Sequence, residues 1–245
     1  MPNIFKRSEV KYLLTAEQRR AVEAVLKDHM IPDEHGESTI RNIYFDTPSW
    51  QLIRNSIEKP VYKEKLRMRS YKRTSESDKV FLELKKKYDG IVYKRRIEVR
   101  EKDFADYLDG KREFPEKGQI ADEIDYFCRF YKKLVPAVYL CYDRCALFDK
   151  DDDSLRITFD RNIRWRTYGV SLTEEAGGTD ILDEGMSLME IKAADAMPLW
   201  LVKVLNENNI RKVSFSKYGT AYRQMLEGGN ITGFRNTITK TKEAA

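Results

Sequence analysis

One segment constrains the fold of this chain more than any other, because basic and apolar side chains alternate along it. Every second position from 63 to 69 holds a basic residue, and the apolar residues Leu66 and Met68 lie between these positions. Successive side chains of a β-strand point to opposite faces, so this spacing predicts a strand with one cationic face and one apolar face. The basic residues of this strand are Lys63, Lys65, Arg67 and Arg69.

The same alternation recurs along several other segments. For a single strand, the usual explanation is that the polar face of an antiparallel sheet meets water. When strand after strand carries Lys and Arg, like charges lie opposite one another, which is unfavourable unless an anion neutralises them. The other charged residues on these polar faces are Glu83, Lys85, Lys87, Lys94, Arg96, Glu98, Arg100, Arg156 and Asp160, together with Arg7, Glu9, Lys11, Glu190 and Lys192 nearer the two ends.

A sheet that closes with its charged faces inward would concentrate their field around an anion in a low-dielectric channel. The apolar faces would then point outward, where helices can cover them. The order of elements predicts such an α+β fold, an antiparallel β-tunnel with helices packed outside. Strands are expected at residues 5–11, 42–46, 62–71, 79–87, 92–100, 138–148, 155–160, 163–166 and 188–193. Helices are expected at residues 15–30, 48–56, 103–108, 120–132, 198–206 and 216–226, the first with Thr15 as its N-cap.

No Pro/Gly-rich linker divides the chain, so we expect one domain over residues 1–228. The acidic, glycine-bearing residues 170–187 are expected to form a surface loop. Residues 229–245 are polar and basic with little periodicity, and we expect a flexible C-terminal tail there.

The composition says more about where the protein is located than about its function. The 45 Lys+Arg against 40 Asp+Glu leave a net charge of only +5, which does not identify a partner. We find no apolar run near the ~20 residues of a membrane span and no signal-peptide core, so we expect a cytoplasmic protein without a membrane segment. Cys141 and Cys145 are too far apart along one expected strand for a disulfide. His29 and His35 are the only histidines, and no Cys/His metal spacing exists.

Glutamates also lie on the expected polar faces, at Glu9, Glu83, Glu98 and Glu190. A carboxylate inside a closed cavity is costly unless it is paired or holds a metal. Its hard oxygen ligands suit Mg²⁺ or Mn²⁺. For Glu83 and Glu98 we expect salt bridges to strand neighbours, whereas both explanations stay open for Glu9 and Glu190.

A set of short motifs runs through nearly the whole chain in a fixed order. Together they resemble the VTC domain, the catalytic module of the vacuolar transporter chaperone complex and its bacterial relatives, which belongs with the CYTH proteins to the triphosphate tunnel superfamily. The motifs are Arg7-Ser8-Glu9-Val10-Lys11-Tyr12, Tyr44-Phe45-Asp46, Lys65-Leu66-Arg67-Met68-Arg69, Glu83-Leu84-Lys85, Tyr142-Asp143-Arg144, Leu155-Arg156-Ile157, Met189-Glu190-Ile191-Lys192 and Phe215-Ser216-Lys217-Tyr218.

The resemblance implies an antiparallel tunnel of about eight strands that holds a triphosphate or a growing polyphosphate chain. It implies that phosphate is bound by Lys11, Arg54, Arg67, Arg69, Lys85, Arg144, Arg156, Ser216 and Lys217. Ser216 and Lys217 would act at the start of a helix, whose N–H groups favour anions. Glu190 would bind the metal, Mn²⁺ or Mg²⁺. The catalytic set is then Lys11, Arg67, Arg69, Lys85 and Glu190.

Two positions depart from the patterns of the superfamily. The CYTH branch begins with Glu-x-Glu-x-Lys, and Arg7 stands here in place of the first glutamate, which favours the VTC branch. The VTC pattern has a lysine two residues before the helix-start serine, and here that residue is Ser214, so one contact is missing or is replaced by Lys212. The sequence shows neither an SPX domain nor membrane helices, so coupling to a membrane or to inositol phosphates is not implied.

The resemblance favours a metal-dependent phosphotransferase, a polyphosphate polymerase that passes the γ-phosphate of ATP to a polyphosphate chain. One alternative is a triphosphatase of the same fold that uses water as acceptor. A second is a non-enzymatic binder of polyanions or nucleic acid, which Tyr62, Tyr71 and Tyr93 could support by stacking on bases. Most of these tyrosines are expected on the face opposite the basic residues, so no nucleic acid is expected as partner.

Overall fold

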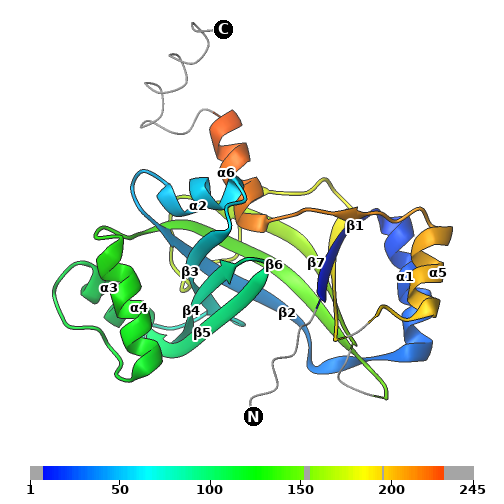
Figure 1. Ribbon diagram of the computed structural model, residues 1–245, viewed down its shortest axis with the longest axis horizontal. Coiled ribbons are helices and arrows are strands. Elements are labelled where there is room, and N and C mark those ends of the chain that lie inside the picture. Colours follow the sequence, from blue (N-terminus) through cyan, green and yellow to red (C-terminus); the bar gives the residue numbers. More distant parts are fainter. Residues whose placement is uncertain (1–7, 152–154, 195, 229–245) are drawn as a thin grey trace, which may run out of the picture. The chain divides into compact units, whose positions relative to one another are not determined.

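The structure is a computed structural model that describes residues 8–151, 155–194 and 196–228 (Figure 1). Arg7 and the expected tail at residues 229–245 lie outside the described residues. Within these ranges no helix combines the length and apolar character needed to cross a bilayer. Cys128, Cys141 and Cys145 are free thiols, as the spacing of the last two predicts.

The described residues form an α+β fold with a large antiparallel sheet. Its helices are α1 (Ala16–His29), α2 (Gln51–Ile57), α3 (Glu101–Leu108), α4 (Gln119–Phe130), α5 (Leu199–Glu207) and α6 (Lys217–Glu227). Its longer strands are β1 (Ser8–Leu14), β2 (Met30–Asp46), β3 (Tyr62–Ser70), β4 (Lys79–Tyr88), β5 (Ile91–Arg100), β6 (Val135–Asp149), β7 (Leu155–Arg166) and β9 (Ser187–Ala193). Two-residue strands, β8 (Thr179–Asp180) and β10 (Lys212–Val213), complete the set.

The strand order is β10-β1-β9-β7-β6-β2-β3-β4-β5, with β8 beside β7. The eight longer strands agree with the number expected for a tunnel. The order is a path with two ends, and its end strands β10 and β5 are not paired, so in the described residues the sheet is not closed into the expected tunnel. Thr15 caps α1 through a capping box, in which Gln18 N–H donates to its hydroxyl at 3.2 Å and the Gln18 side chain accepts from the Thr15 N–H.

Two strands differ most from what the sequence predicts. The first, β2, begins at Met30 rather than at residue 42, and it runs through Pro32 and Gly36, which are typical of turns. The expected strands at 155–160 and 163–166 form the single strand β7. Asn162 lies inside it with φ 49°, and its side-chain amide donates to Asp143 at 2.8 Å. The strand therefore passes through one left-handed residue without ending.

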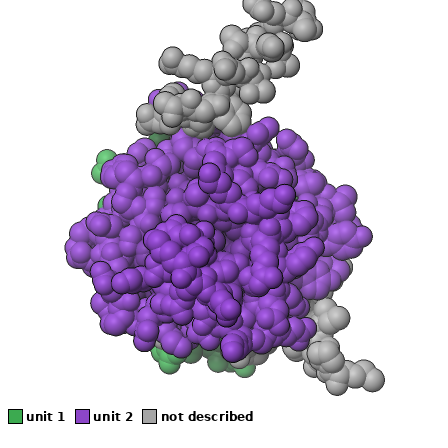
Figure 2. Space-filling model, turned by 90° about the vertical axis from the view of Figure 1, so that its left-hand side faces the viewer, with its two compact units in different colours: residues 1–40, 141–164, 182–215 green, residues 41–140, 165–181, 216–245 purple. Residues whose placement is uncertain are grey.

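The chain divides into two compact units (Figure 2). Unit 1 comprises residues 1–40, 141–164 and 182–215, and unit 2 comprises residues 41–140, 165–181 and 216–245. By these ranges unit 1 contains α1, β1, β9, α5 and β10, and unit 2 contains α2, β3, β4, β5, α3, α4, β8 and α6. Each unit is described by itself below.

In unit 1 the apolar faces of β1, β9 and β7 form a core with α1 and α5, which lie beside each other in Figure 1. Met189 and Ile191 are at most 1% exposed in this core. Their neighbours Glu190 and Lys192 point to the other face, as the alternation predicts. The helices contribute Val22, Leu26, Leu201, Val204 and Leu205. Burial of one such side chain stabilises the fold by about 1.5–3 kcal/mol, so the apolar faces drive the packing.

Unit 2 repeats this separation of faces on β3, β4 and β5. Leu66, Met68, Leu82 and Leu84 are fully buried on one face. The helices α3 and α4 contact β5 and contribute the buried Phe104, Ile124 and Phe127 (Figure 1). The turn between β4 and β5 is Asp89-Gly90, whose φ values of 43° and 81° are those of a tight hairpin.

The loop that follows β7 is fixed to unit 2 by one arginine. The Arg166 guanidinium donates to the carbonyls of Tyr168, Gly169, Glu175 and Gly177. Its charged carbon also lies 3.8 Å from the centre of the Tyr139 ring. The expected surface loop at residues 170–187 is therefore an anchored segment, with β8 inside it.

Gly178 in this loop leaves no room for a side chain. Its φ is 133°, and a Cβ there would lie 2.3 Å from the Trp165 carbonyl oxygen. We expect Gly178→Ala to lower the free energy of unfolding by more than the roughly 1–3 kcal/mol of backbone strain alone. Gly90→Ala is the control, because Gly90 also has a positive φ but nothing lies within 4 Å of its added Cβ. Denaturant unfolding measures both, and equal losses would contradict the close approach.

Candidate anion-binding site

The polar face of β3, β4 and β5 carries a large excess of positive charge. The strand registers place ten basic residues and two carboxylates on this face, but two basic residues and one carboxylate on the other. Lys65, Lys85 and Lys94 lie directly opposite one another across the three strands. Like charges in such positions repel, so the face favours an anion. The ten basic residues are Lys63, Lys65, Arg67, Arg69, Lys79, Lys85, Lys87, Lys94, Arg96 and Arg100.

Glu83 is the carboxylate at the centre of this face, and it is 1% exposed. Arg67 Nε lies 2.7 Å from its Oε2, while Lys94 Nζ and Arg96 Nη2 lie 2.6 Å and 2.5 Å from its Oε1. Burial alone would raise the pKa of Glu83, but the charges of Arg67, Arg69 and Lys94 hold it well below its usual value. Glu83 therefore forms the salt bridges that the sequence predicts for it. Its single negative charge does not balance the three cations around it, so this region keeps a net positive charge. Glu98 is exposed on the same face.

The polar face of β3 continues onto β2, where Tyr44 and Asn42 lie beside Arg67 and Arg69. The register pairs Tyr44 with Arg67 and Asn42 with Arg69. Arg69 Nε donates to Asn42 Oδ1 at 3.0 Å, and the Asn42 amide donates to the Leu140 carbonyl at 3.1 Å. Arg69 is only 7% exposed, so its guanidinium is held in a fixed direction.

Asp46 joins the two helices that carry three of the expected phosphate ligands. Its carboxylate accepts from the N–H groups of Leu52 and Ile53 in α2, each at 2.9 Å, and from the Tyr218 hydroxyl in α6, also at 2.9 Å. Arg54 lies exposed on α2, and α6 begins at Ser216 and Lys217. Burial raises the pKa of Asp46 against the effect of these donors.

Ser216 is the N-cap of α6, because its hydroxyl accepts from the Gly219 N–H at 3.2 Å. Lys65 Nζ donates to the same oxygen at 3.3 Å. Ser216, Lys65 and the first turn of α6 are thus brought together, and Lys65 is not among the phosphate ligands that the resemblance implies. Lys217 is partly buried, and Lys85 is exposed on the polar face.

In unit 1, Lys11 lies between Glu190, the expected metal ligand, and Glu9. Its Nζ is 3.4 Å from Glu9 Oε1 and 3.4 Å from Glu190 Oε1. The register places Lys11 opposite Glu190 and Glu9 opposite Lys192, and Lys192 Nζ lies 3.6 Å from Glu9. Glu190 is only 9% exposed. Here, unlike on the face in unit 2, the charges of the two signs nearly balance.

Arg144 and Arg156 occupy different settings in unit 1. Arg144 donates through two nitrogens to Asp160, at 2.6 Å and 2.7 Å, and its Nη2 also lies 3.5 Å from Glu190. This bidentate pair fixes the guanidinium in its plane. Arg156 is more exposed, and its Nη2 lies 3.8 Å from Asp33. Of these two predicted phosphate ligands, Arg144 is the one that lies beside Glu190.

The acidic residues of unit 1 can be tested for a fit to a divalent metal. Among the described residues no three His, Cys, Asp or Glu side chains gather into a metal-binding group. Glu9 and Glu190 do gather around one lysine. Mg²⁺ is often bound by one or two carboxylates together with substrate phosphates, so this pair fits a metal that arrives with its phosphates.

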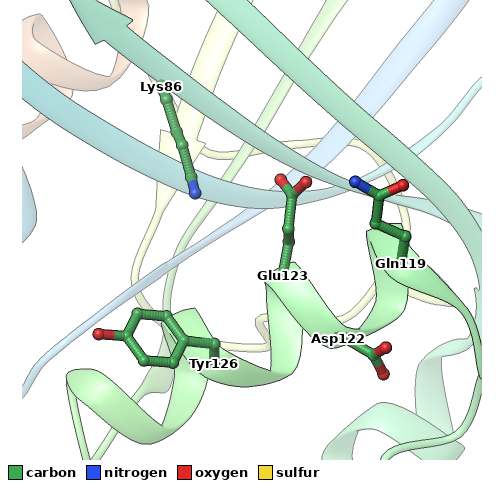
Figure 3. Close-up of a pocket in the computed structure, with 5 residues that line it drawn as sticks. All are labelled: Lys86, Gln119, Asp122, Glu123 and Tyr126. Carbon is green, nitrogen blue, oxygen red and sulfur yellow. The ribbon is translucent and has the colours of Figure 1, made fainter.

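A surface pocket elsewhere in unit 2 does not suit an anion (Figure 3). Its lining residues are Lys86, Gln119, Asp122, Glu123 and Tyr126. Lys86 lies on the face of β4 opposite Lys85, and Arg95 Nε is 2.9 Å from Glu123. With two carboxylates and one lysine in its lining, the pocket would repel polyphosphate.

The sequence pattern predicts no role for Tyr44, Asp46 or Asn42. The first two stand in the motif Tyr44-Phe45-Asp46, but a motif does not show which side chains meet. The alternation of β2 was the available signal, because Asn42, Tyr44 and Asp46 share a face. Tyr62 and Tyr93 lie on the face opposite the basic residues, as expected, whereas Tyr71 accepts from Arg96 at 3.3 Å.

Comparison with known proteins gives one matching family model and several similar structures. The family model of the VTC domain matches residues 6–226. A Bacillus halodurans protein proposed to be an adenylate cyclase has a similar structure, with TM-score 0.51, 15% identity, and 85% of this chain and 92% of that chain covered. A Vibrio parahaemolyticus protein with the same proposed activity gives TM-score 0.48, 11% identity, and coverages of 88% and 97%. HpAC1 from Hippeastrum, described as having a dominant triphosphatase activity, gives TM-score 0.48, 15% identity, and coverages of 93% and 98%. The search of curated proteins found no match.

Proposed function

Because this chain belongs to the VTC domain family, we propose that it is a polyphosphate polymerase, which transfers the γ-phosphate of ATP to the end of a polyphosphate chain. The observation that carries this proposal is the polar face of β3–β5, with ten basic residues against two carboxylates. A polyanion is the ligand that such a face favours.

Each predicted site residue has a role in this proposal. In unit 2, Arg67, Arg69 and Lys85 would hold phosphate oxygens, and Arg offers a planar fork that matches them. Ser216, Lys217 and Arg54 would contact phosphate at the start of α6 and on α2. In unit 1, Lys11, Arg144 and Arg156 would be further phosphate ligands, and Glu190 would hold Mn²⁺ or Mg²⁺. The metal supplies neutralisation of the charge that develops on the phosphates.

Phosphoryl transfer requires few further functional groups from the protein. Phosphoryl transfer needs in-line geometry and charge neutralisation, with little covalent chemistry from side chains. The terminal phosphate of a polyphosphate chain is already an anionic nucleophile, so no general base is required. Histidine is the most common general base, and this chain has only two histidines, so its composition is consistent with such a mechanism.

The test is product analysis with the purified protein, ATP and Mn²⁺. Long-chain polymer on a gel supports the polymerase. Orthophosphate alone shows that water is the acceptor, which is the triphosphatase alternative. Binding without turnover that excess oligonucleotide competes away would show a nucleic-acid binder instead.

Anion binding should also stabilise the folded protein, since it relieves repulsion among the lysines that face each other. Tripolyphosphate at about 100 times its dissociation constant should add roughly 2.7 kcal/mol to the free energy of unfolding. Thermal unfolding measures this as a rise in Tm. Chloride at matched ionic strength is the control, and an equal rise with chloride would contradict a specific site.

A further inference from the structure

Tyr44 is buried at the cationic face, although nothing in the sequence assigned it a role. It is 8% exposed, and its ring stacks on Tyr218 with 4.5 Å between centroids and 20° between planes. The register places it opposite Arg67 on β3. Its hydroxyl therefore has a fixed position at the edge of the basic residues.

The hydrogen bonds of this hydroxyl are incomplete within the protein. Arg67 Nη1 donates to the Tyr44 oxygen at 3.4 Å, so the oxygen acts as an acceptor. In the described part of the chain, no acceptor takes the Tyr44 proton. Tyr218 differs, because its hydroxyl donates to Asp46 at 2.9 Å. Arginine and lysine side chains carry only donors, so the cations beside Tyr44 cannot accept its proton.

We propose that Tyr44 is a ligand of the bound phosphate chain, donating its hydroxyl proton to a phosphate oxygen that Arg67 also binds. A buried donor without an acceptor is unfavourable, and a phosphate oxygen supplies the missing acceptor. The inference rests on the proposed anion-binding function and adds to it a neutral donor whose protonation state controls binding.

The charges around Tyr44 make this proton easy to lose. Burial would raise the pKa of Tyr44, but the charges of Arg67, Lys65 and Arg69 and the hydrogen bond from Arg67 lower it to about 8. The other groups near it are Glu83, which pairs with Arg67, and Tyr218 with Asp46. The pKa of Tyr218 is raised well above its usual value by burial and by Asp46, so Tyr218 keeps its proton.

The sign of the pH effect follows from this pKa. Below pH 8 the free protein carries a neutral Tyr44 that can donate to phosphate. Above pH 8 it carries a phenolate that neutralises Arg67 and repels the anion. The apparent Kd equals the intrinsic Kd divided by the protonated fraction, so binding should weaken about tenfold between pH 7 and pH 9.

The experiment compares wild type with Tyr44→Phe, which keeps the stacked ring and removes the hydroxyl. Metal-free tripolyphosphate is titrated at constant ionic strength at pH 7, 8 and 9, and the ratio of the two Kd values cancels the ligand's own titration. At pH 7 the variant should bind about tenfold more weakly, since the lost hydrogen bond is to a charged group. At pH 9 the ratio should approach one. Tyr62→Phe is the control, because Tyr62 lies on the opposite face and donates to Glu64 at 2.5 Å.

A second readout does not depend on binding strength. Absorbance at the tyrosinate band should show one tyrosine that titrates near pH 8 in wild type, that is missing in Tyr44→Phe, and that moves to higher pH with tripolyphosphate. A Kd ratio that stays constant from pH 7 to pH 9 overturns the inference about Tyr44 alone. Absence of tripolyphosphate binding in wild type overturns the proposed function itself.

Discussion

Replacing Arg67 by alanine should lower kcat/KM for ATP by about 30- to 5,000-fold, the equivalent of roughly 2–5 kcal/mol for losing one charge-assisted contact in a desolvated site. Arg67 lies at the centre of the polar face, 2.7 Å from Glu83 and 3.4 Å from the Tyr44 hydroxyl. The variant should still fold, because Lys94 and Arg96 continue to compensate the buried Glu83. Arg69→Ala should act in the same direction.

Two controls separate this loss from general damage. Arg95→Ala removes the same kind of side chain from the opposite face of β5, where it pairs with Glu123, and it should leave turnover unchanged. Met68→Ala should instead lower the free energy of unfolding by about 2–5 kcal/mol, because Met68 is fully buried. Steady-state kinetics and denaturant unfolding distinguish the three variants. Wild-type turnover in Arg67→Ala would show that this face does not hold the substrate.

Glu190→Gln should abolish metal-dependent turnover while the protein remains folded. Glu190 lies 3.4 Å from Lys11 and 3.5 Å from Arg144. A buried carboxylate without such partners would cost several kcal/mol, so its charge must be compensated by these cations or by a metal. The amide keeps the shape of the side chain but is a poor ligand for Mn²⁺. Binding of metal-free polyphosphate should persist or strengthen, because one negative charge is gone.

The measurement is turnover as a function of Mn²⁺ concentration, together with polyphosphate binding in a chelator. Glu207→Gln is the control, since Glu207 is an exposed residue of α5 that pairs with Lys203 at 3.9 Å. If Glu190 only pairs with Lys11 and Arg144, the variant loses stability but keeps its activation curve. An unchanged Mn²⁺ curve in folded Glu190→Gln would therefore rule out the ligand role.

The sequence by itself determined which residues share a face. A strand has a period of two, so the placement of Arg67 and Arg69 apart from Leu66 and Met68 follows from their numbers alone. The same period predicts that Met189 and Ile191 share an apolar face, and both are buried in the core of unit 1. Strand existence was likewise predicted wherever the alternation was regular. Only the start of β2 was wrong, because its first part runs through Pro32 and Gly36, which are typical of turns.

Only the tertiary structure decided which charges meet. The period of a strand does not specify its register, and the register is what brings Lys94 and Arg96 of β5 to Glu83 of β4 and places Tyr44 of β2 opposite Arg67 of β3. Asp46 contacts Tyr218 across 172 positions of sequence. Such partners depend on where distant segments pack, so a basic face can be predicted from local spacing, whereas the hydrogen bonds and pKa values within it cannot.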